Sequence, residues 1–132
     1  MRKITSILEM GKDGYGVYFP EIPNIFGFGE TVEDAKIDAK NVIIFFVENL
    51  KKLNRPIPEV LQQEYELNFE FDIKSLLKYI NGTVTKTALS KASGINASQL
   101  SHYSSGKKTP RQSQRLKILN GIHKIGRELT MM

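Results

Sequence analysis

The chain has 132 residues, 40% of them hydrophobic, and it contains no cysteine. This length allows one ordinary domain or two small domains, each with its own core. The absence of cysteine excludes disulfides, thiolate metal sites and thiol catalysis, and it favours a cytoplasmic protein. The longest apolar run, Val42 to Val47, is far too short to cross a bilayer, and the N-terminus predicts no secretory signal, so we expect no membrane association.

The net charge of +5 is distributed unevenly along the chain. Residues 1–71 contain 8 Lys and Arg against 12 Asp and Glu, a net charge of −4, whereas residues 72–132 contain 11 against 2, a net charge of +9. A basic segment suits nucleic acid, whereas an acidic segment suits a basic protein partner. We therefore expect two domains with different partners, over residues 1–71 and 72–132.

Hydrophobic alternation predicts three strands in the first half, over residues 3–10, 15–19 and 25–29. The four residues from Gly11 to Gly14 predict a hairpin between the first two strands. Between the second and third, the segment Pro20-Glu21-Ile22-Pro23-Asn24 is expected to interrupt the sheet, because a proline has no N–H to donate.

A long helix is predicted after Thr31, which serves as its N-cap, and it is expected to run to the stop at Arg55-Pro56. Its apolar residues recur at helical spacing, but Ile44 and Phe45 lie off that stripe. Either the helix is buried on two sides, or its second face serves self-association. Residues 65–71 alternate without a break and predict a fourth strand, so the order β-β-β-α-β gives an α+β layer.

The start of the long helix allows two readings for function. The pattern Gly27-x-Gly29-x-Thr31 is typical of a tight strand-to-helix turn, or less often of a phosphate cradle. The neighbouring acidic residues are typical of dipole partners at a helix start, or less often of metal ligands; they are Glu30, Glu33, Asp34 and Asp38. We favour the first reading in each case and expect no cofactor and no metal.

Two motifs carry a resemblance to a known family. The segments Tyr18-Phe19-Pro20-Glu21-Ile22-Pro23 and Gly29-Glu30-Thr31-x-Glu33-Asp34-Ala35, with Ala39, resemble the N-terminal domain of HicB-type antitoxins. The resemblance implies a degenerate ribonuclease-H-like β-β-β-α-β fold over residues 4–71, and a HicA-type mRNA interferase as the bound toxin. Asn24 departs from the family's usual glycine, and Phe26-Gly27-Phe28 from its more polar strand.

Ribonuclease H chemistry needs several carboxylates that converge on two metal ions. The predicted strands carry only Glu9, Glu66 and Glu70, so we expect no enzyme activity.

The proline-rich turn is also the first candidate for contact with the toxin. Two prolines stiffen the turn, and a rigid loop loses little entropy on binding. The candidate contacts are Tyr18, Glu21, Ile22, Phe28 and Glu30. The alternative is that the prolines only end a strand.

The second half predicts four helices, over residues 72–80, 85–92, 96–104 and from Pro110 towards Leu129. Gly94 and Gly106 are expected to end the second and third helices. Thr109 is expected to cap the last helix, with Pro110 as its first residue. Gly121 and Gly126 weaken that last prediction.

The middle pair resembles the helix-turn-helix of the phage-repressor class (XRE, lambda-repressor-like). The matching residues run from Leu89-Ser90 through Gly94-Ile95 and Ser98-Gln99-Leu100-Ser101 to Gly106-Lys107 and Pro110. Ser93 departs from that pattern, because its position is usually apolar. The exposed side of the third helix suits base edges in a major groove, and the flanking cations suit phosphates. The candidate base contacts are Asn96, Ser98, Gln99, Ser101 and His102, and the candidate phosphate contacts are Lys86, Lys107, Lys108 and Arg111.

The two resemblances together predict an antitoxin of a type II system that also represses its own operon. Its expected partners are a small basic HicA-like toxin and double-stranded operator DNA, bound as a homo-dimer or higher oligomer because one module covers only a half-site. The alternative is a phage-repressor-type regulator whose N-terminal domain dimerises or senses a ligand. A residual ribonuclease-H-like nuclease ranks third.

Overall fold

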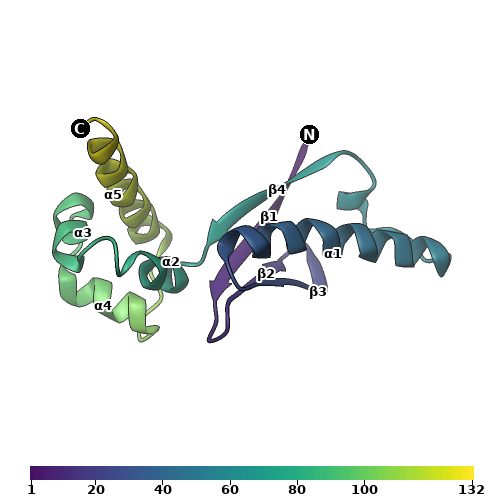
Figure 1. Cartoon of the computed structure of the whole chain (residues 1–132), viewed down its shortest axis with the longest axis horizontal. Coiled ribbons are helices and arrows are strands. Elements are labelled where there is room, and N and C mark those ends of the chain that lie inside the picture. Colours follow the sequence, from purple (N-terminus) through teal and green to yellow (C-terminus); the bar gives the residue numbers. More distant parts are fainter. The chain divides into compact units, whose positions relative to one another are not determined.

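A computed structural model describes all residues from 1 to 132. Its internal contacts divide the chain into two compact units, Met1–Asp72 (unit 1) and Ile73–Met132 (unit 2), and each is described by itself (Figure 1). None of the helices combines the length and the apolar character that a bilayer crossing requires.

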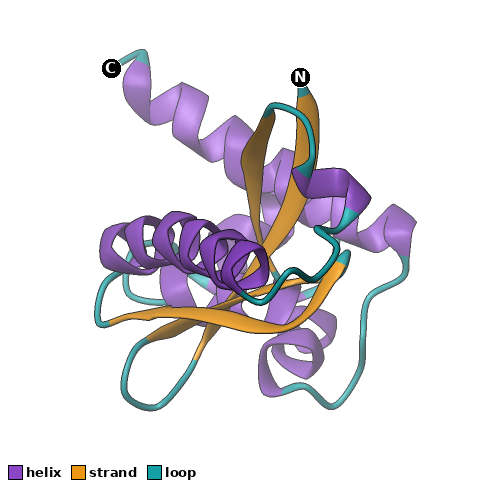
Figure 2. Ribbon diagram, turned by 90° about the vertical axis from the view of Figure 1, so that its right-hand side faces the viewer, coloured by secondary structure: helices purple, strands orange, loops and turns teal.

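Unit 1 consists of a four-stranded sheet and one long helix, with the strands shown in orange in Figure 2. The sheet has the order β3-β2-β1-β4; β1 runs antiparallel to β2 and parallel to β4. This α+β architecture confirms the predicted fold class. The elements are β1 (Arg2–Met10), β2 (Tyr15–Phe19), β3 (Ile22–Gly29), α1 (Val32–Lys52), the short 3-10 helix η1 (Glu59–Leu61) and β4 (Tyr65–Phe71).

Strand β3 begins earlier than predicted, at Ile22, so the interruption of the sheet is shorter than the predicted five residues. Phe19 pairs with Ile22 and Tyr18 pairs with Phe26, which leaves the residues from Pro23 to Ile25 as a bulge. Pro23 is tolerated because β3 is an edge strand, where a missing N–H need not break a ladder. Asn24 takes a left-handed conformation with φ of 71°, which its side chain permits.

Helix α1 packs against β3 and β2 through small residues. A Cβ atom added to Gly29 would lie 2.2 Å from the backbone nitrogen of Ala35, and one added to Gly27 would lie 3.0 Å from the Cα of Ala39. Only glycine allows so close an approach of strand and helix. This geometry confirms the predicted tight turn at Gly27-x-Gly29-x-Thr31.

The start of α1 is fixed by two side chains that accept backbone hydrogen bonds. The Thr31 hydroxyl accepts from the Asp34 N–H at 3.0 Å, which confirms the predicted N-cap. The Asp38 carboxylate accepts from the N–H of Phe28 at 2.7 Å and so ties the helix to the edge strand.

The outer face of α1 is exposed, so the prediction of burial on two sides is wrong for the single chain. Ala35, Ala39 and Ile43 are fully buried, whereas Ile44 and Phe45 are 51% and 68% exposed. The helix ends at Lys52 and not at Arg55, because the chain turns away at its C-cap, Leu53.

Unit 2 contains four helices: α2 (Ile73–Ile80), α3 (Lys86–Ser93), α4 (Ala97–Ser105) and α5 (Gln112–Thr130). They enclose one core of Ile73, Leu77, Leu89, Ile95, Leu100, Tyr103 and Ile118. The predicted glycine stops are confirmed, because Gly94 and Gly106 end α3 and α4 with φ of 79° and 82°. The side chains of Thr85 and Asn96 cap the starts of the same two helices.

The predicted start of the last helix is wrong. Helix α5 begins at Gln112, and its N-cap, Arg111, makes no side-chain capping hydrogen bond. Thr109 and Pro110 belong to a connection that folds back on α4. In that connection the N–H of Lys108 donates to the carbonyl of His102 at 3.2 Å.

Two glycines of α5 are expected to respond in opposite directions to alanine substitution. A Cβ atom at Gly121 would lie 3.0 Å from the backbone of Ser93, whereas one at Gly126 would meet nothing within 4 Å. Gly126→Ala should therefore stabilise the helix by about 0.5–1 kcal/mol. Gly121→Ala should destabilise unit 2 by about 1–2 kcal/mol, because the crowding outweighs the gain in helix propensity. Amide hydrogen exchange in α3 and α5 of the full chain measures both effects, and equal signs would contradict this packing.

Candidate nucleic-acid interface and partner surface

Helices α3 and α4 are joined by only three residues, Gly94, Ile95 and Asn96. The buried side chains of Leu89, Ile95 and Leu100 hold the pair together. Ser93 occupies the position where an apolar residue was expected, and the structure supplies a reason. Its hydroxyl accepts from the N–H of Ile95 at 3.2 Å, a bond that an apolar side chain could not make. Its backbone lies against Gly121 of α5, where an added Cβ atom would be 3.0 Å away.

The predicted base contacts differ in how free their side chains are. Ser98 and Ser101 are exposed on α4. The Asn96 side-chain oxygen already accepts from the N–H of Gln99 at 2.8 Å, and the Gln99 side-chain nitrogen donates to the Tyr103 hydroxyl at 2.9 Å. His102 is half-buried, and its Nδ1 is enclosed without a hydrogen-bond partner. Ser98 and Ser101 are therefore the best-presented polar groups of the five.

The bond to Tyr103 orients the Gln99 side chain. It uses one of the two N–H donors of the amide, so the second N–H and the side-chain oxygen remain available. One donor together with one acceptor matches the major-groove edge of adenine.

A polar cleft of about 490 Å³ lies beside Gln99, at the start of α5. It brings together three of the predicted DNA contacts, because Gln99, Lys108 and Arg111 all line it. Its other lining residues are Tyr103, Thr109, Ser113 and Gln114. The first N–H groups of α5 have no side-chain cap at this point, so two cations, several hydroxyls and a helix N-terminus meet at one place. That combination suits a phosphate oxygen.

The predicted phosphate contacts Lys86 and Lys107 do not line this cleft. Lys86 is the first residue of α3, and Lys107 follows α4, where its N–H donates to the Ser105 hydroxyl at 3.3 Å. One cation was missed: Lys74 of α2 lies against Gly106, and its Nζ would be 3.1 Å from a Cβ atom there. No sequence signal joins residues 74 and 106, which only the fold brings together.

Unit 1 presents an aromatic row on the face of the sheet opposite α1, which we call the open sheet face. Ile7 lies beside Tyr18, and Tyr18 lies beside Phe26 on the edge strand; Phe28 follows next to Gly16. Neighbouring strand residues alternate between the two faces, so this row points away from the core residues Leu8 and Val17. Phe26 is 68% exposed and Phe28 is 53% exposed.

Acidic groups border the open sheet face. Glu9, Glu66 and Glu70 lie on the same side of the strands, and Glu30 follows the end of β3. Burial, and after it the carboxylates of Glu9 and Asp72, raises the pKa of the Tyr18 hydroxyl above its usual 10.0. Tyr18 therefore stays neutral at physiological pH, with an apolar ring and a hydrogen-bonding tip.

Two of the predicted toxin contacts, Ile22 and Glu21, do not belong to the open sheet face. Ile22 is only 2% exposed and belongs to the core, so its side chain is not presented at the surface of unit 1. Glu21 pairs with Arg2. Tyr18, Phe28 and Glu30 remain at the surface, and the structure adds Phe26 and Ile7 beside them. The cross-strand register decides which side chains share the open sheet face. Alternation along a single strand does not reveal that register.

The carboxylates form no obvious metal centre. The structure contains no group of three or more His, Asp or Glu side chains placed to hold a metal ion. Asp38, one of the acids considered as a ligand, is instead hydrogen-bonded to the backbone of Phe28.

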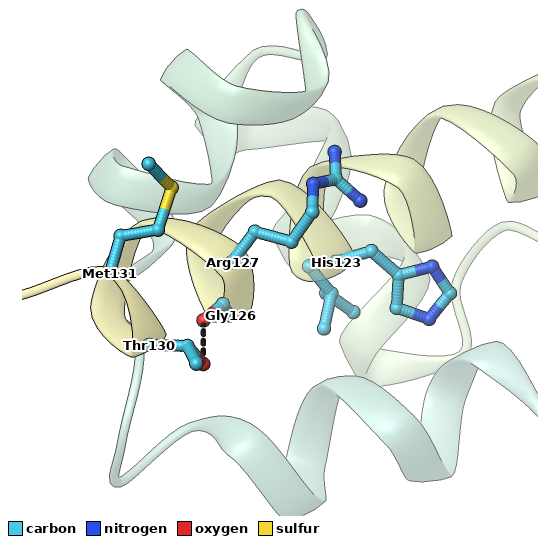
Figure 3. A pocket seen from close by; sticks show the side chains of 6 residues that line it. His123, Gly126, Arg127, Thr130 and Met131 are labelled. Carbon is cyan, nitrogen blue, oxygen red and sulfur yellow. Dashed lines mark hydrogen bonds between the residues drawn. The ribbon is translucent and has the colours of Figure 1, made fainter.

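A third surface feature is an apolar hollow of about 680 Å³ on the last turns of α5 (Figure 3). Its lining residues are Ile122, His123, Gly126, Arg127, Thr130 and Met131. The Thr130 hydroxyl donates to the Gly126 carbonyl at 2.8 Å, so that polar group is satisfied within the helix. Five of these residues belong to α5 and the sixth, Met131, is its C-cap, so no second helix or strand lines the hollow.

Comparison with known proteins identifies relatives of this chain. Residues 4–98 match the family described as the HicB-like antitoxin of bacterial toxin–antitoxin systems, a stretch that covers nearly all of unit 1 and extends into α4. The UPF0150 protein ssl0738 of Synechocystis is 38% identical over 64 residues, which are 47% of this chain and 89% of that protein.

Two further relatives match stretches of similar length. The UPF0150 protein Ta0767 of Thermoplasma acidophilum is 40% identical over 57 residues, which are 42% of this chain and 83% of that protein. An uncharacterised 14.9 kDa protein from the rep–hol intergenic region of Haemophilus phage HP1 is 31% identical over 61 residues, 46% of each chain.

Proposed function

The chain belongs to the HicB-like antitoxin family, and on that premise we propose that it acts through two separate surfaces. Unit 1 neutralises a HicA-like mRNA-interferase toxin by direct binding. Unit 2 binds double-stranded operator DNA through a helix-turn-helix formed by α3 and α4, and so represses the operon that encodes both proteins. The observation that supports the proposal most is the match between charge and surface. The acidic half has an exposed aromatic face, and the basic half has a polar cleft lined by Lys108 and Arg111.

The DNA-binding half of the proposal rests on the arrangement around α4. A short helix with exposed serines suits the major groove, and cations on the following turn suit the flanking phosphates. The turn is rigid, because the backbone of Lys107 and of Lys108 is hydrogen-bonded back to α4. A fixed backbone at Lys107 and Lys108 favours phosphate contacts that set the register of a recognition helix on the duplex. Unit 2 also carries one acidic residue, Glu128, against 11 basic residues, so little repulsion opposes the approach to DNA.

The toxin-binding half rests on the open sheet face. Aromatic side chains are enriched at protein interfaces, and the few residues that dominate the binding energy lie at the centre with less important contacts around them. Phe26, Phe28 and Tyr18 form such a centre, and Glu9 and Glu30 lie at its border. A toxin that holds RNA must itself be basic, so the acidic border would steer it to this face.

Phe26→Lys tests this assignment. The change removes an exposed ring and adds a charge that repels a basic partner, so we expect at least a hundredfold weaker toxin binding, which is about 3 kcal/mol. Growth rescue on co-expression with the toxin from the neighbouring reading frame should be lost. A pull-down with the same toxin measures the loss directly, and circular dichroism checks that the variant is folded.

The matched control is Phe45→Lys on α1, since Phe45 is also 68% exposed but lies away from the sheet. It should retain the toxin, and so should Glu21→Lys, because Glu21 is engaged with Arg2. Loss of toxin in the Phe45 variant with retention in the Phe26 variant would move the contact to α1. If no neighbouring basic protein binds the chain at all, the alternative of a regulator with a ligand-sensing or dimerising N-terminal domain takes its place.

A further inference from the structure

The outer face of α1 is a second exposed apolar surface of unit 1, on the other side of the helix from the core. Ile37, Ile44 and Phe45 are 50%, 51% and 68% exposed on it. Residues 37, 41, 44, 48 and 51 follow one another at steps of four and three, so they line one side of the helix. Three large apolar side chains on the solvent-exposed side of one helix indicate a surface that a binding partner covers.

The charges at the two ends of this face are opposite in sign. Glu33 and Asp34 lie in the first turn of α1, and Lys51 and Lys52 lie in the last turn. Such charges complement the dipole of the helix itself. The same charges make the face self-complementary. In an antiparallel pair, the lysines of each copy would lie against the acidic residues of the other copy. The dipole alone gives no reason for the apolar residues between them.

We propose that the outer face of α1 is the interface between two copies of this chain, packed antiparallel about a two-fold axis near the middle of the helix. Helix α1 has 21 residues and is about 31 Å long, so its full length is available to the second copy. The axis brings both copies of Ile44 and Phe45 to the centre, where water is excluded. The Glu33 and Asp34 end of each helix meets the Lys51 and Lys52 end of the other.

Charge distinguishes this occupant from the toxin. The two ends of the outer face of α1 carry opposite charges, so a uniformly basic protein would meet repulsion at the Lys51 and Lys52 end. The open sheet face is bordered mainly by acids and suits that partner better. The interface is isologous, as in most homodimers, since each copy contributes the same residues.

The test is the mass of the full chain in solution, by size-exclusion chromatography with light scattering. Ile44→Glu with Phe45→Glu should halve the mass of the assembly, whereas Phe26→Glu, at an equally exposed phenylalanine on the open sheet face, should leave it unchanged. Toxin pull-down with the same variants should give the reverse result. The mass is measured without toxin or DNA. An unchanged mass would therefore contradict the proposed interface without contradicting the proposed function.

A charge exchange separates an interface from a dipole effect. Lys51→Glu with Lys52→Glu should raise the dimer dissociation constant at least about tenfold. Adding Glu33→Lys and Asp34→Lys should restore it, because the ends are complementary again. If the charges serve only the helix dipole, the fourfold variant is less stable than the double variant and does not regain mass. Unchanged mass in the Ile44 and Phe45 variant, or loss of toxin binding without loss of mass, would overturn the proposal.

Discussion

Replacing Gly29 by valine is expected to unfold unit 1 and to abolish any binding that depends on it. A Cβ atom at this position would lie 2.2 Å from the nitrogen of Ala35 and 2.6 Å from the carbonyl carbon of Asp34. Both are backbone atoms of the first turn of α1, so no side chain can move aside. Separating α1 from β3 would also open the contact of Gly27 with Ala39, on which the core depends.

The expected cost of Gly29→Val is at least about 3 kcal/mol, the upper range for an overpacked core. A unit of this size has a total stability of roughly 5 kcal/mol, so a large unfolded fraction results. Urea unfolding of the full chain, followed by circular dichroism, measures the loss. The matched control is Gly16→Ala in the neighbouring strand, where an added Cβ meets only the carbonyl oxygen of Gly27 at 4.0 Å. Equal stability of the two variants would show that α1 does not pack as closely as described.

Most of the secondary structure was predictable because it follows from local patterns. Alternation located β2 and β4 to the residue, and helical spacing with capping residues located α1, α3 and α4 to within one or two residues at each start. The motif resemblance in the first half was likewise confirmed by the family match. These features depend on residues that are close in sequence.

The errors arose where distant segments decide the local structure. The strand β3 starts before Pro23 because it is at the edge of the sheet, which the sequence pattern does not state. The last helix starts after Pro110 because the preceding turn folds back on α4. The two neighbouring prolines predict a turn at Ile22, yet its side chain alternates into the core.

The candidate site was less predictable than the fold. Residue type alone suggested that Asn96 and Gln99 read bases, but both side chains make hydrogen bonds within α4. The polar cleft joins residues 99 to 114 across two helices and a turn, so only the folded chain shows that Gln99 and Arg111 share it. Side-chain availability is a property of packing, which composition and spacing do not contain.

Removing the cations after α4 should weaken DNA binding on every sequence. Lys107, Lys108 and Arg111 are exposed, and two of them line the polar cleft. If each contacts one phosphate, their combined replacement by alanine should reduce the slope of log affinity against log salt by about 3, from roughly 0.9 for each contact. Fluorescence anisotropy with operator and random duplexes at several salt concentrations measures the slope, and both duplexes should lose affinity alike.

Gln99→Ala should have a different signature, because a base contact carries sequence information. We expect a loss of about 1–3 kcal/mol on the operator and little change on random duplex. Tyr103→Phe, which removes the hydroxyl that orients Gln99, should reproduce part of the operator-specific loss while keeping the buried ring in place. Lys124→Ala on α5 is the control for charge alone, since it removes an exposed cation outside the cleft. If the variant that lacks Lys107, Lys108 and Arg111 keeps the wild-type salt slope, the DNA lies on another face of unit 2. Equal losses on operator and random duplex for Gln99→Ala would lead to the same conclusion.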